Sequence, residues 1–455
     1  MKRKLKNFAA ILATATIMVG AVPNSIWAVD ANSITNVSGN KITVEKILAV
    51  RDGATVPNVS FSYTLEGGTV QTGSSSSLAI YSGSDTTKIT GGLPKVKIGA
   101  SGSETGAGQT NTISYSNTDS YDETTDTRMT ISGYKSVTKN ITLDFEGITF
   151  NEPGVYRYKL TEDTTAKTGV TFDVNKDGTA GTGNGVRTID VYVENAENAV
   201  EGKYPLYIAG YIIYEGEVTG QPANTASEYP TASATNTTPN NNAQVSDTVI
   251  DSATKSDCYI NKYTTYDLKV TKNVSGNQAS RDKYFKVNVK FTGLPSTTYA
   301  VDISGAVASP EITPATDSTY TSMSNPTTIT TNNDGKVDQD FYLQHGQYVT
   351  VKGVPENISY TVEETAEDYS PSKTVATGTG KDSDIDTTNS TASKVIDTKI
   401  EGDADVTFTN SRSGILPTGI IISMAPAIGF IAVSLAALFA FIVGAKKRKA
   451  ELDEE

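Results

Sequence analysis

Short runs of β-branched and aromatic residues, broken by turn residues, recur along most of the chain. Within these runs apolar and polar positions alternate, as in ITVEKILAV (42–50) and LKVTKNV (268–274), and this alternation is typical of strands with one buried face. Outside the two ends of the chain, no long stretch has the periodicity of an amphipathic helix. The pattern therefore predicts an all-β protein with long polar loops.

The two ends of the chain are apolar and break this pattern. Residues 1–28 combine a basic start, an apolar run and small residues before a cleavage site, which predicts a secretory signal peptide rather than a first membrane span. Residues 420–445 are apolar and long enough to cross a membrane as a helix. The tail, 446–455, is first basic and then acidic, and its basic residues favour the cytoplasmic side. We therefore expect the body of the chain to lie outside the cell.

The body of the chain is acidic, since the whole sequence has 38 Lys and Arg against 51 Asp and Glu. This balance excludes the basic surface that nucleic-acid binding requires. The length between the two ends suggests about two or three domains. We predict one domain over 29–263 and a second over 264–414, joined by the short polar hinge KYTTYD (262–267).

Catalytic and metal-binding side chains are scarce, because the chain has one cysteine, Cys258, and one histidine, His345. This excludes an intramolecular disulfide and makes a Ser-His-Asp triad or a zinc site untenable. The stretch DVNKDGTAGTGN (173–184) loosely resembles a calcium loop but lacks the terminal glutamate. We predict no metal and no cofactor, and we expect Cys258 to be a small buried side chain.

Three polar residue types interrupt the apolar faces of predicted strands, in the same order, twice along the chain. In each case a lysine comes first, a glutamate follows in the middle and an asparagine ends the segment. A single such residue is explained by a strand end that reaches water, but the repetition favours a shared role. The first triad is Lys46, Glu162 and Asn261, and the second triad is Lys272, Glu364 and Asn410.

Burial of such a triad favours a specific reaction. Desolvation lowers the pKa of a lysine and raises that of a carboxyl group, so a neutral amine beside a protonated acid becomes accessible. The amine then attacks the asparagine carboxamide while the glutamate moves protons, and ammonia leaves. The product is a Lys–Asn isopeptide bond, formed once per triad, so we do not expect an enzyme with turnover.

The segments around these residues resemble the streptococcal-type backbone pilins, which are pilin isopeptide-linkage proteins. The matching segments are KITVEK, EPGVYRYKLTE, YINKY, LKVTKNVSG, SYTVEE and VTFTNSRSGILPTG. The resemblance spans most of residues 40–419, with departures in the loops. It implies two tandem immunoglobulin-like β-sandwiches, in which Glu162 assists a Lys46–Asn261 bond and Glu364 assists a Lys272–Asn410 bond.

Residues 415–419 stand directly before the C-terminal apolar run and contain Leu416, Pro417, Thr418 and Gly419. The proline biases this segment away from helix. The segment, the apolar run and the basic tail together resemble a cell-wall sorting signal, which implies sortase cleavage between Thr418 and Gly419. In the pilins, the threonine is joined to a lysine of the next subunit. Lys255 is the nearest match to that acceptor, with Lys262 and Lys203 in reserve.

The resemblance implies a structural backbone subunit of a covalent pilus on the surface of a Gram-positive bacterium. The implied partners are a pilin-class sortase, identical subunits in a head-to-tail polymer, and peptidoglycan reached through a base subunit or a housekeeping sortase. Contact with the membrane is transient, and no nucleic acid is involved. Two alternatives remain, namely an adhesin anchored singly to the cell wall and a minor pilin at the base or tip.

Overall fold

The computed structural model describes residues 41–73, 79–98, 111–124, 128–195, 203–220, 256–304, 325–377, 381–382, 391–415, 433–444 and 446. These residues form β-strands, turns and one helical stretch over 433–444. The prediction of an all-β protein is confirmed. The finer description of its parts as immunoglobulin-like sandwiches stays a prediction.

The first half of the body, up to residue 263, contains two larger sheets. Sheet 1 has the order β10 (Val170–Thr171), β13 (Cys258–Tyr263), β1 (Lys41–Arg51), β7 (Tyr134–Asp144) and β5 (Lys95–Ile98). Sheet 2 has the order β12 (Leu206–Glu215), β11 (Val186–Asn195), β9 (Gly154–Glu162), β2 (Val59–Gly67) and β6 (Asn111–Tyr115), and β3 (Ile80–Ser82) also pairs with β9. A small separate ladder joins β4 (Ile89–Thr90) to β8 (Thr149–Phe150).

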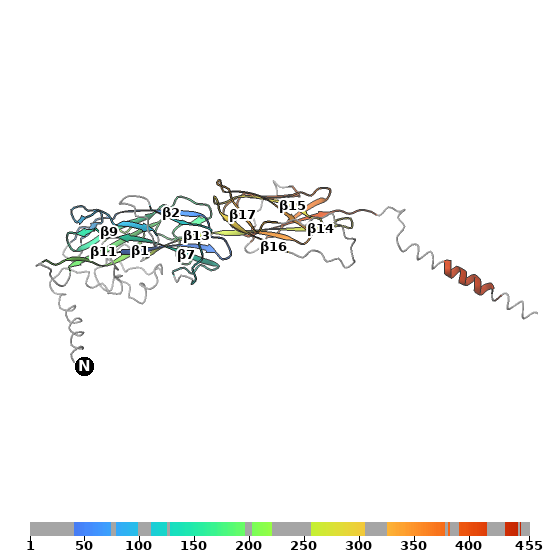
Figure 1. The fold of residues 1–455 in the computed structure, drawn as a ribbon, viewed down its shortest axis with the longest axis horizontal. Helices are drawn as coiled ribbons and strands as arrows, with labels where there is room; N and C mark the ends of the chain where they lie inside the picture. The colour runs from blue at the N-terminus through green and yellow to red at the C-terminus, as the bar shows by residue number, and fades with distance from the viewer. Residues whose placement is uncertain are drawn as a thin grey trace, which may run out of the picture.

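The second half, from residue 265, repeats this arrangement with two further sheets. Sheet 3 has the order β17 (Thr328–Thr330), β16 (Thr298–Ser304), β19 (Tyr348–Pro355), β14 (Thr265–Ser275), β23 (Ala404–Ser411) and β21 (Ser370–Val375). Sheet 4 has the order β18 (Lys336–Leu343), β15 (Phe285–Thr292), β20 (Tyr360–Glu364) and β22 (Lys394–Asp397). The two halves lie end to end along the long axis of the molecule (Figure 1).

Each half encloses one apolar core between its two sheets. In the first half, Val44 and Leu48 of β1 pack in the same cluster as Phe61 of β2 and Leu160 of β9. The alternation along these strands explains this, because every second side chain points to the same face. Sheet 1 is also covered on its other face, where Ile47, Cys258 and Ile260 belong to a separate small cluster.

The first and last strands of each half are neighbours, and they run parallel. In the first half β1 pairs with β13, and in the second half β14 pairs with β23. Parallel neighbours require a crossover connection, and here the rest of each half lies between them in the sequence. A residue near the beginning of each half is therefore beside a residue near its end.

The connection between the halves differs from the predicted polar hinge. Only Thr264 separates β13 from β14, and Thr264 and Thr265 are both buried. The Arg51 side chain donates a hydrogen bond to the Thr265 carbonyl at 3.0 Å and forms an ion pair with Asp403 at 2.7 Å. The peptide nitrogen of Glu356 donates to the Thr264 carbonyl at 3.0 Å. The prediction of a hinge over 262–267 is wrong, because all of these residues except Thr264 belong to strands and the connection is held from both sides.

Two stretches whose polar composition is typical of loops contain strands. The polar stretch 101–127 includes β6, whose Ile113 and Tyr115 are buried in the core of the first half. The stretch 322–336 includes β17, whose Ile329 is buried in the second core. In both cases the strand is short and its polar flanks dominate the composition, so hydrophobic content alone did not reveal it.

Among the described residues, no helix is long and apolar enough to cross a membrane. The helical stretch 433–444 belongs to the apolar segment predicted to span. The predicted signal peptide, residues 1–28, lies outside the described residues, as do residues 420–432. The two end segments therefore stay predictions.

Candidate functional site

The first triad is assembled from three strands in the two facing sheets of the first half. Lys46 of β1 lies opposite Tyr259 of β13, and Asn261 follows two positions later on the same strand. Lys46 and Asn261 therefore point to the same face of sheet 1. Glu162 is the last residue of β9 in sheet 2, and it meets them across the core.

The three side chains of the first triad converge on one oxygen atom. Lys46 Nζ lies 2.7 Å from Glu162 Oε1, and Asn261 Nδ2 donates a hydrogen bond to the same oxygen at 3.0 Å. The Tyr63 hydroxyl donates to it as well, at 2.8 Å. Lys46, Glu162 and Asn261 are all buried. The amine and the carboxamide are thus held beside the same acid, out of contact with water.

The surroundings of Lys46 favour loss of its proton. Its Nζ lies 4.7 Å from the centre of the Phe61 ring and 5.8 Å from that of Tyr259. Burial lowers the pKa of the Lys46 ammonium, and this effect outweighs the opposing attraction of Glu162. A buried lysine with a lowered pKa is a competent nucleophile once its proton has moved to a neighbouring acid.

The second triad repeats the same register in the second half. Lys272 of β14 lies opposite Phe408 of β23, and Asn410 again follows two positions later. Lys272 Nζ is 3.1 Å from Glu364 Oε1, and Asn410 Nδ2 donates to that oxygen at 2.5 Å. The Phe285 ring lies 4.6 Å from Lys272 Nζ. Burial lowers the pKa of Lys272 to about 8.

The two triads differ in the groups that surround them. Tyr63 lies directly opposite Glu162 in the β2–β9 pair, whereas Val287 occupies the corresponding place opposite Glu364. The carboxamide oxygen of Asn261 accepts a hydrogen bond from the peptide nitrogen of Asp173 at 2.9 Å. Among the described residues, the buried Oδ1 atom of Asn410 has no hydrogen-bond partner.

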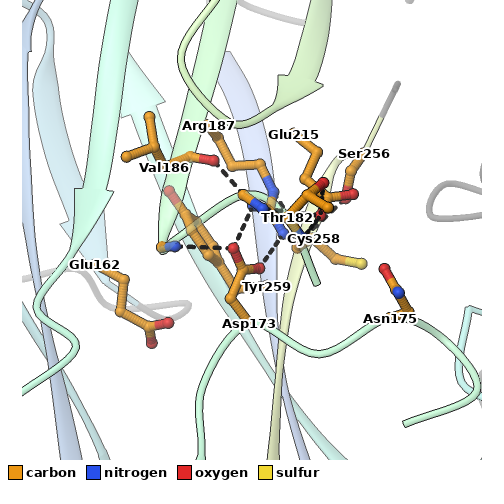
Figure 2. Close-up of polar contacts among 12 residues, drawn as sticks. Glu162, Asp173, Asn175, Thr182, Val186, Arg187, Glu215, Ser256, Cys258 and Tyr259 are labelled. Carbon is orange, nitrogen blue, oxygen red and sulfur yellow. Dashed lines mark hydrogen bonds and ion pairs between the residues drawn. The ribbon is translucent and has the colours of Figure 1, made fainter. Parts of the chain in front are cut away.

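The sequence alone did not single out Tyr63, Asp173 or Arg187. Tyr63 lies on the apolar face of VSFSYTLEG, where it is indistinguishable from an ordinary core residue. Asp173 opens the stretch that loosely resembles a calcium loop, but its carboxylate is paired with Arg187, with Oδ1 2.6 Å from Nη2. Among the described residues no group of three or more potential metal ligands is present. Figure 2 shows Asp173 and Arg187 close to Tyr259.

The remaining predicted positions fall partly outside the described residues. Lys255 and the motif Leu416, Pro417, Thr418 and Gly419 all belong to that part of the chain. Of the two reserve acceptors, Lys203 is exposed, and Lys262 is half-buried with its Nζ 5.1 Å from the centre of the Tyr134 ring. Cys258 is buried, as expected.

The unique histidine, His345, lies in a turn and is partly buried, and its side chain is tied to a neighbouring strand. Its Nδ1 accepts a hydrogen bond from the peptide nitrogen of Val274 at 2.9 Å. Partial burial lowers the pKa of His345, and Arg281 and Lys272 act in the same direction. The neutral ring is therefore favoured, as its acceptor role requires.

Comparison with known proteins gives matches to both halves and to the whole chain. Residues 94–203 match a Spy0128-like isopeptide containing domain, and residues 266–412 match a domain of unknown function. A pilin of Streptococcus pyogenes serotype M1 is 24% identical over 439 residues, which cover 93% of this chain and 96% of that protein.

Solved structures of streptococcal pilins are also similar. The major pilin from Streptococcus pyogenes has 20% sequence identity and a TM-score of 0.44, covering 83% of this chain and 100% of that one. The T3.2 major pilin of the same species has 19% identity and a TM-score of 0.43, with the same coverage. The chain thus contains a segment that matches a Spy0128-like isopeptide containing domain, and it is similar to a curated pilin over nearly its full length.

Proposed function

We propose that each half of the chain closes an internal Lys–Asn isopeptide bond. Lys46 would join to Asn261 with Glu162 as the proton carrier, and Lys272 would join to Asn410 with Glu364. The observation that carries this proposal is the repeated geometry, in which a buried lysine and a buried asparagine contact the same glutamate oxygen in both halves.

The reaction balances within each triad. The lysine ammonium gives one proton to the glutamate, and the neutral amine attacks the asparagine Cγ. A second proton passes from the attacking nitrogen to the departing amide nitrogen, and the Cγ–Nδ2 bond breaks. Ammonia leaves, and the lysine nitrogen remains bonded to Cγ. Each triad reacts once, so the chain acts as a structural protein rather than an enzyme.

The position of these bonds suits a protein that carries mechanical load. Each bond would tie the first strand of a half to its last strand, which is its parallel neighbour. Tension applied to the two ends of a half would otherwise pull these strands apart. With the bond in place, the force passes from one terminal strand to the other and bypasses the remaining strands.

We propose further that the chain is the backbone subunit of a covalent pilus on a Gram-positive cell surface. A pilin-class sortase would cleave after Thr418 and join that residue to Lys255 of the next subunit. The pilus would then be attached to the cell wall through a base subunit or a housekeeping sortase. This is supported by the similarity to streptococcal pilins over nearly the full length of the chain.

Intact mass tests the internal bonds directly. The full chain is expected to be lighter than its sequence mass by about 34 Da, the mass of two ammonia molecules. Glu162→Ala and Glu364→Ala should each restore one ammonia, whereas Glu66→Ala, which removes an exposed carboxylate, should restore none. An unmodified mass in the unaltered chain would refute the bonds.

Polymer formation is tested separately, in cells that express the chain with its sortase. A ladder of SDS-resistant, high-mass species is expected, and Lys255→Ala or Thr418→Ala should abolish it. Lys203→Ala is the matched control on a reserve acceptor and should leave the ladder intact. A single wall-bound band from the unaltered chain would show a singly anchored protein, and a ladder that persists in Lys255→Ala would show that another lysine is the acceptor.

A further inference from the structure

The carboxamide oxygen of Asn261 faces a peptide nitrogen whose position is held by a buried ion pair. We infer that the Asp173–Arg187 pair positions the Asp173 peptide N–H as an oxyanion donor for the Lys46–Asn261 bond. This inference rests on the proposed crosslink of the first half and adds a device that the described residues of the second half lack. The donor lies 2.9 Å from Asn261 Oδ1.

The backbone of Asp173 is held in an unusual conformation by its own carboxylate. Its φ is 46°, in the left-handed region that non-glycine residues seldom occupy. Asp173 Oδ2 accepts a hydrogen bond from the Gly185 peptide nitrogen at 2.8 Å and from Arg187 Nη1 at 3.1 Å. The next residue, Val174, donates its peptide N–H to the Ile260 carbonyl at 2.8 Å. These contacts fix the direction in which the Asp173 N–H points.

Gly185 is required at its position in this arrangement. Its φ of 75° lies in the left-handed region, and an added Cβ would lie 2.7 Å from Thr164 Cγ2 and 3.0 Å from the Glu162 carbonyl oxygen. A side chain there would disturb both the bond to Asp173 and the residue that bears the catalytic carboxylate. The Asp173–Arg187 pair, here called the clamp, and Glu162, the proton carrier, are therefore both packed against Gly185.

Arg187 connects the clamp to the strand that carries Asn261. Its Nε and Nη2 donate to the Cys258 carbonyl at 3.0 and 2.7 Å, and its guanidinium lies 4.4 Å from the centre of the Tyr259 ring. The Tyr259 hydroxyl in turn donates to the Leu160 carbonyl at 2.7 Å. Figure 2 shows the guanidinium bridging Asp173 and Cys258. The donor and its target thus share one rigid support.

The arrangement assigns separate roles to the two ends of the Asn261 carboxamide. When Lys46 attacks Cγ, negative charge develops on Oδ1, where the Asp173 N–H already points. The nitrogen that leaves, Nδ2, faces Glu162 Oε1, which can relay to it the proton released by the attacking lysine nitrogen. The Asp173 amide also fixes which end of the carboxamide is oxygen, because an N–H cannot donate to an amide N–H₂.

The second half provides an internal control within the same molecule. There the Asn410 oxygen is buried and, within the described ranges, receives no hydrogen bond. Loss of the clamp should therefore slow ammonia release from the first triad and leave the second triad unchanged. Both reactions are read from one sample as the masses of peptides that span each bond.

The test follows crosslinking over time in full-length chains made by cell-free synthesis and quenched in denaturant. Asp173→Asn is expected to slow the first crosslink about tenfold or more, since misplaced oxyanion donors cost that much or more. The matched control is Asp190→Asn, which breaks another buried Arg–Asp pair in the same half, with Arg157 at 2.7 Å. Equal rates in the unaltered chain and Asp173→Asn, or equal slowing by both variants, would overturn the inference.

A second variant distinguishes positioning from loss of structure. The charged groups that act on Lys46 are Glu162, Asp173 and Arg187. The Tyr259 ring lies beside its Nζ, the Tyr63 hydroxyl shares its Glu162 oxygen, and the Tyr115 hydroxyl donates to its carbonyl oxygen. Asp173 raises the pKa of Lys46 and Arg187 lowers it. In a plot of the rate of the first crosslink against pH, the decrease in rate at high pH should therefore move to lower pH in Asp173→Asn. In Arg187→Gln it should move to higher pH. Decreases that stay in place or move together would contradict the clamp's action on the triad.

A third measurement keeps the clamp intact, for the case that both variants fail to fold. In Glu162→Ala, which cannot crosslink its first half, the Asp173 amide proton should exchange slowly with solvent. Adding Asn261→Ala should accelerate that exchange, and an unchanged rate would refute the hydrogen bond. If the unaltered chain itself retains the first ammonia, the proposed crosslink fails; if it loses ammonia at the rate of Asp173→Asn, only the clamp fails.

Discussion

Replacing Asn410 by alanine, alone and together with Lys272→Met, measures what the second isopeptide bond contributes to stability. Asn410→Ala removes the bond and also one hydrogen bond to Glu364. In the Lys272→Met background the bond is already absent, so the same replacement removes only the side-chain contacts. The difference between the two destabilisations isolates the covalent contribution.

The size of this contribution follows from the length of chain that the bond closes. From Lys272 to Asn410 the loop is about 140 residues, for which the entropy relation for crosslinks gives about 5 kcal/mol at 25 °C. For a unit of this size the loss corresponds to a melting temperature lower by about 10–20 °C. The first half, with a longer loop between Lys46 and Asn261, should show a slightly larger effect in the matched pair Asn261→Ala and Lys46→Met.

The assay is guanidinium-induced unfolding of the full chain, with the other half as the reference transition. Noncovalent neighbours in one network show couplings up to about 3 kcal/mol. A coupling well above that value is expected only if the lysine and asparagine are joined. The bond would be refuted by a coupling of 3 kcal/mol or less, together with an intact mass of the unaltered protein that shows no loss of ammonia. A buried ion pair would then remain in its place.

Three further predictions concern Asp397, Tyr63 and Arg51. Burial and the neighbouring Asp382 raise the pKa of Asp397 to about 6, so the stability that this raised pKa provides at low pH is lost as pH rises through about 6. Thermal melts from pH 4 to 8 should show that loss, and Asp397→Asn should remove it; identical profiles would contradict the assignment. Tyr63→Phe removes a hydrogen-bond donor to Glu162. It should slow the crosslink of the first half but not that of the second, as measured from the masses of peptides that span each bond. An unchanged rate would show that the hydroxyl is dispensable. Arg51→Met breaks the bidentate pair with Asp403 and should lower the free energy of unfolding by about 1 kcal/mol or less. It should also widen the range of angles between the two halves, which small-angle scattering measures. An unchanged scattering profile would show that other contacts hold the halves together.

The sequence by itself determined which side chains face the cores. Because successive side chains of a strand point to opposite faces, the alternation around Lys46 and Lys272 placed both lysines on apolar faces, and the structure confirms that both are buried. The same reasoning placed Glu162, Glu364, Asn261 and Asn410 on apolar faces. Local periodicity was sufficient here, since it depends on neighbours within one strand.

Only the tertiary structure decided which strands are neighbours and in what register. The parallel pairing of β1 with β13, and the two-residue offset from Tyr259 to Asn261, bring together residues that are far apart in the chain. Asp173 and Arg187 likewise acquire their roles from a left-handed backbone conformation and from contact with β13. Composition and periodicity record no such long-range contacts. The peptide N–H that faces Asn261 carries no sequence signal, because every residue except proline has one.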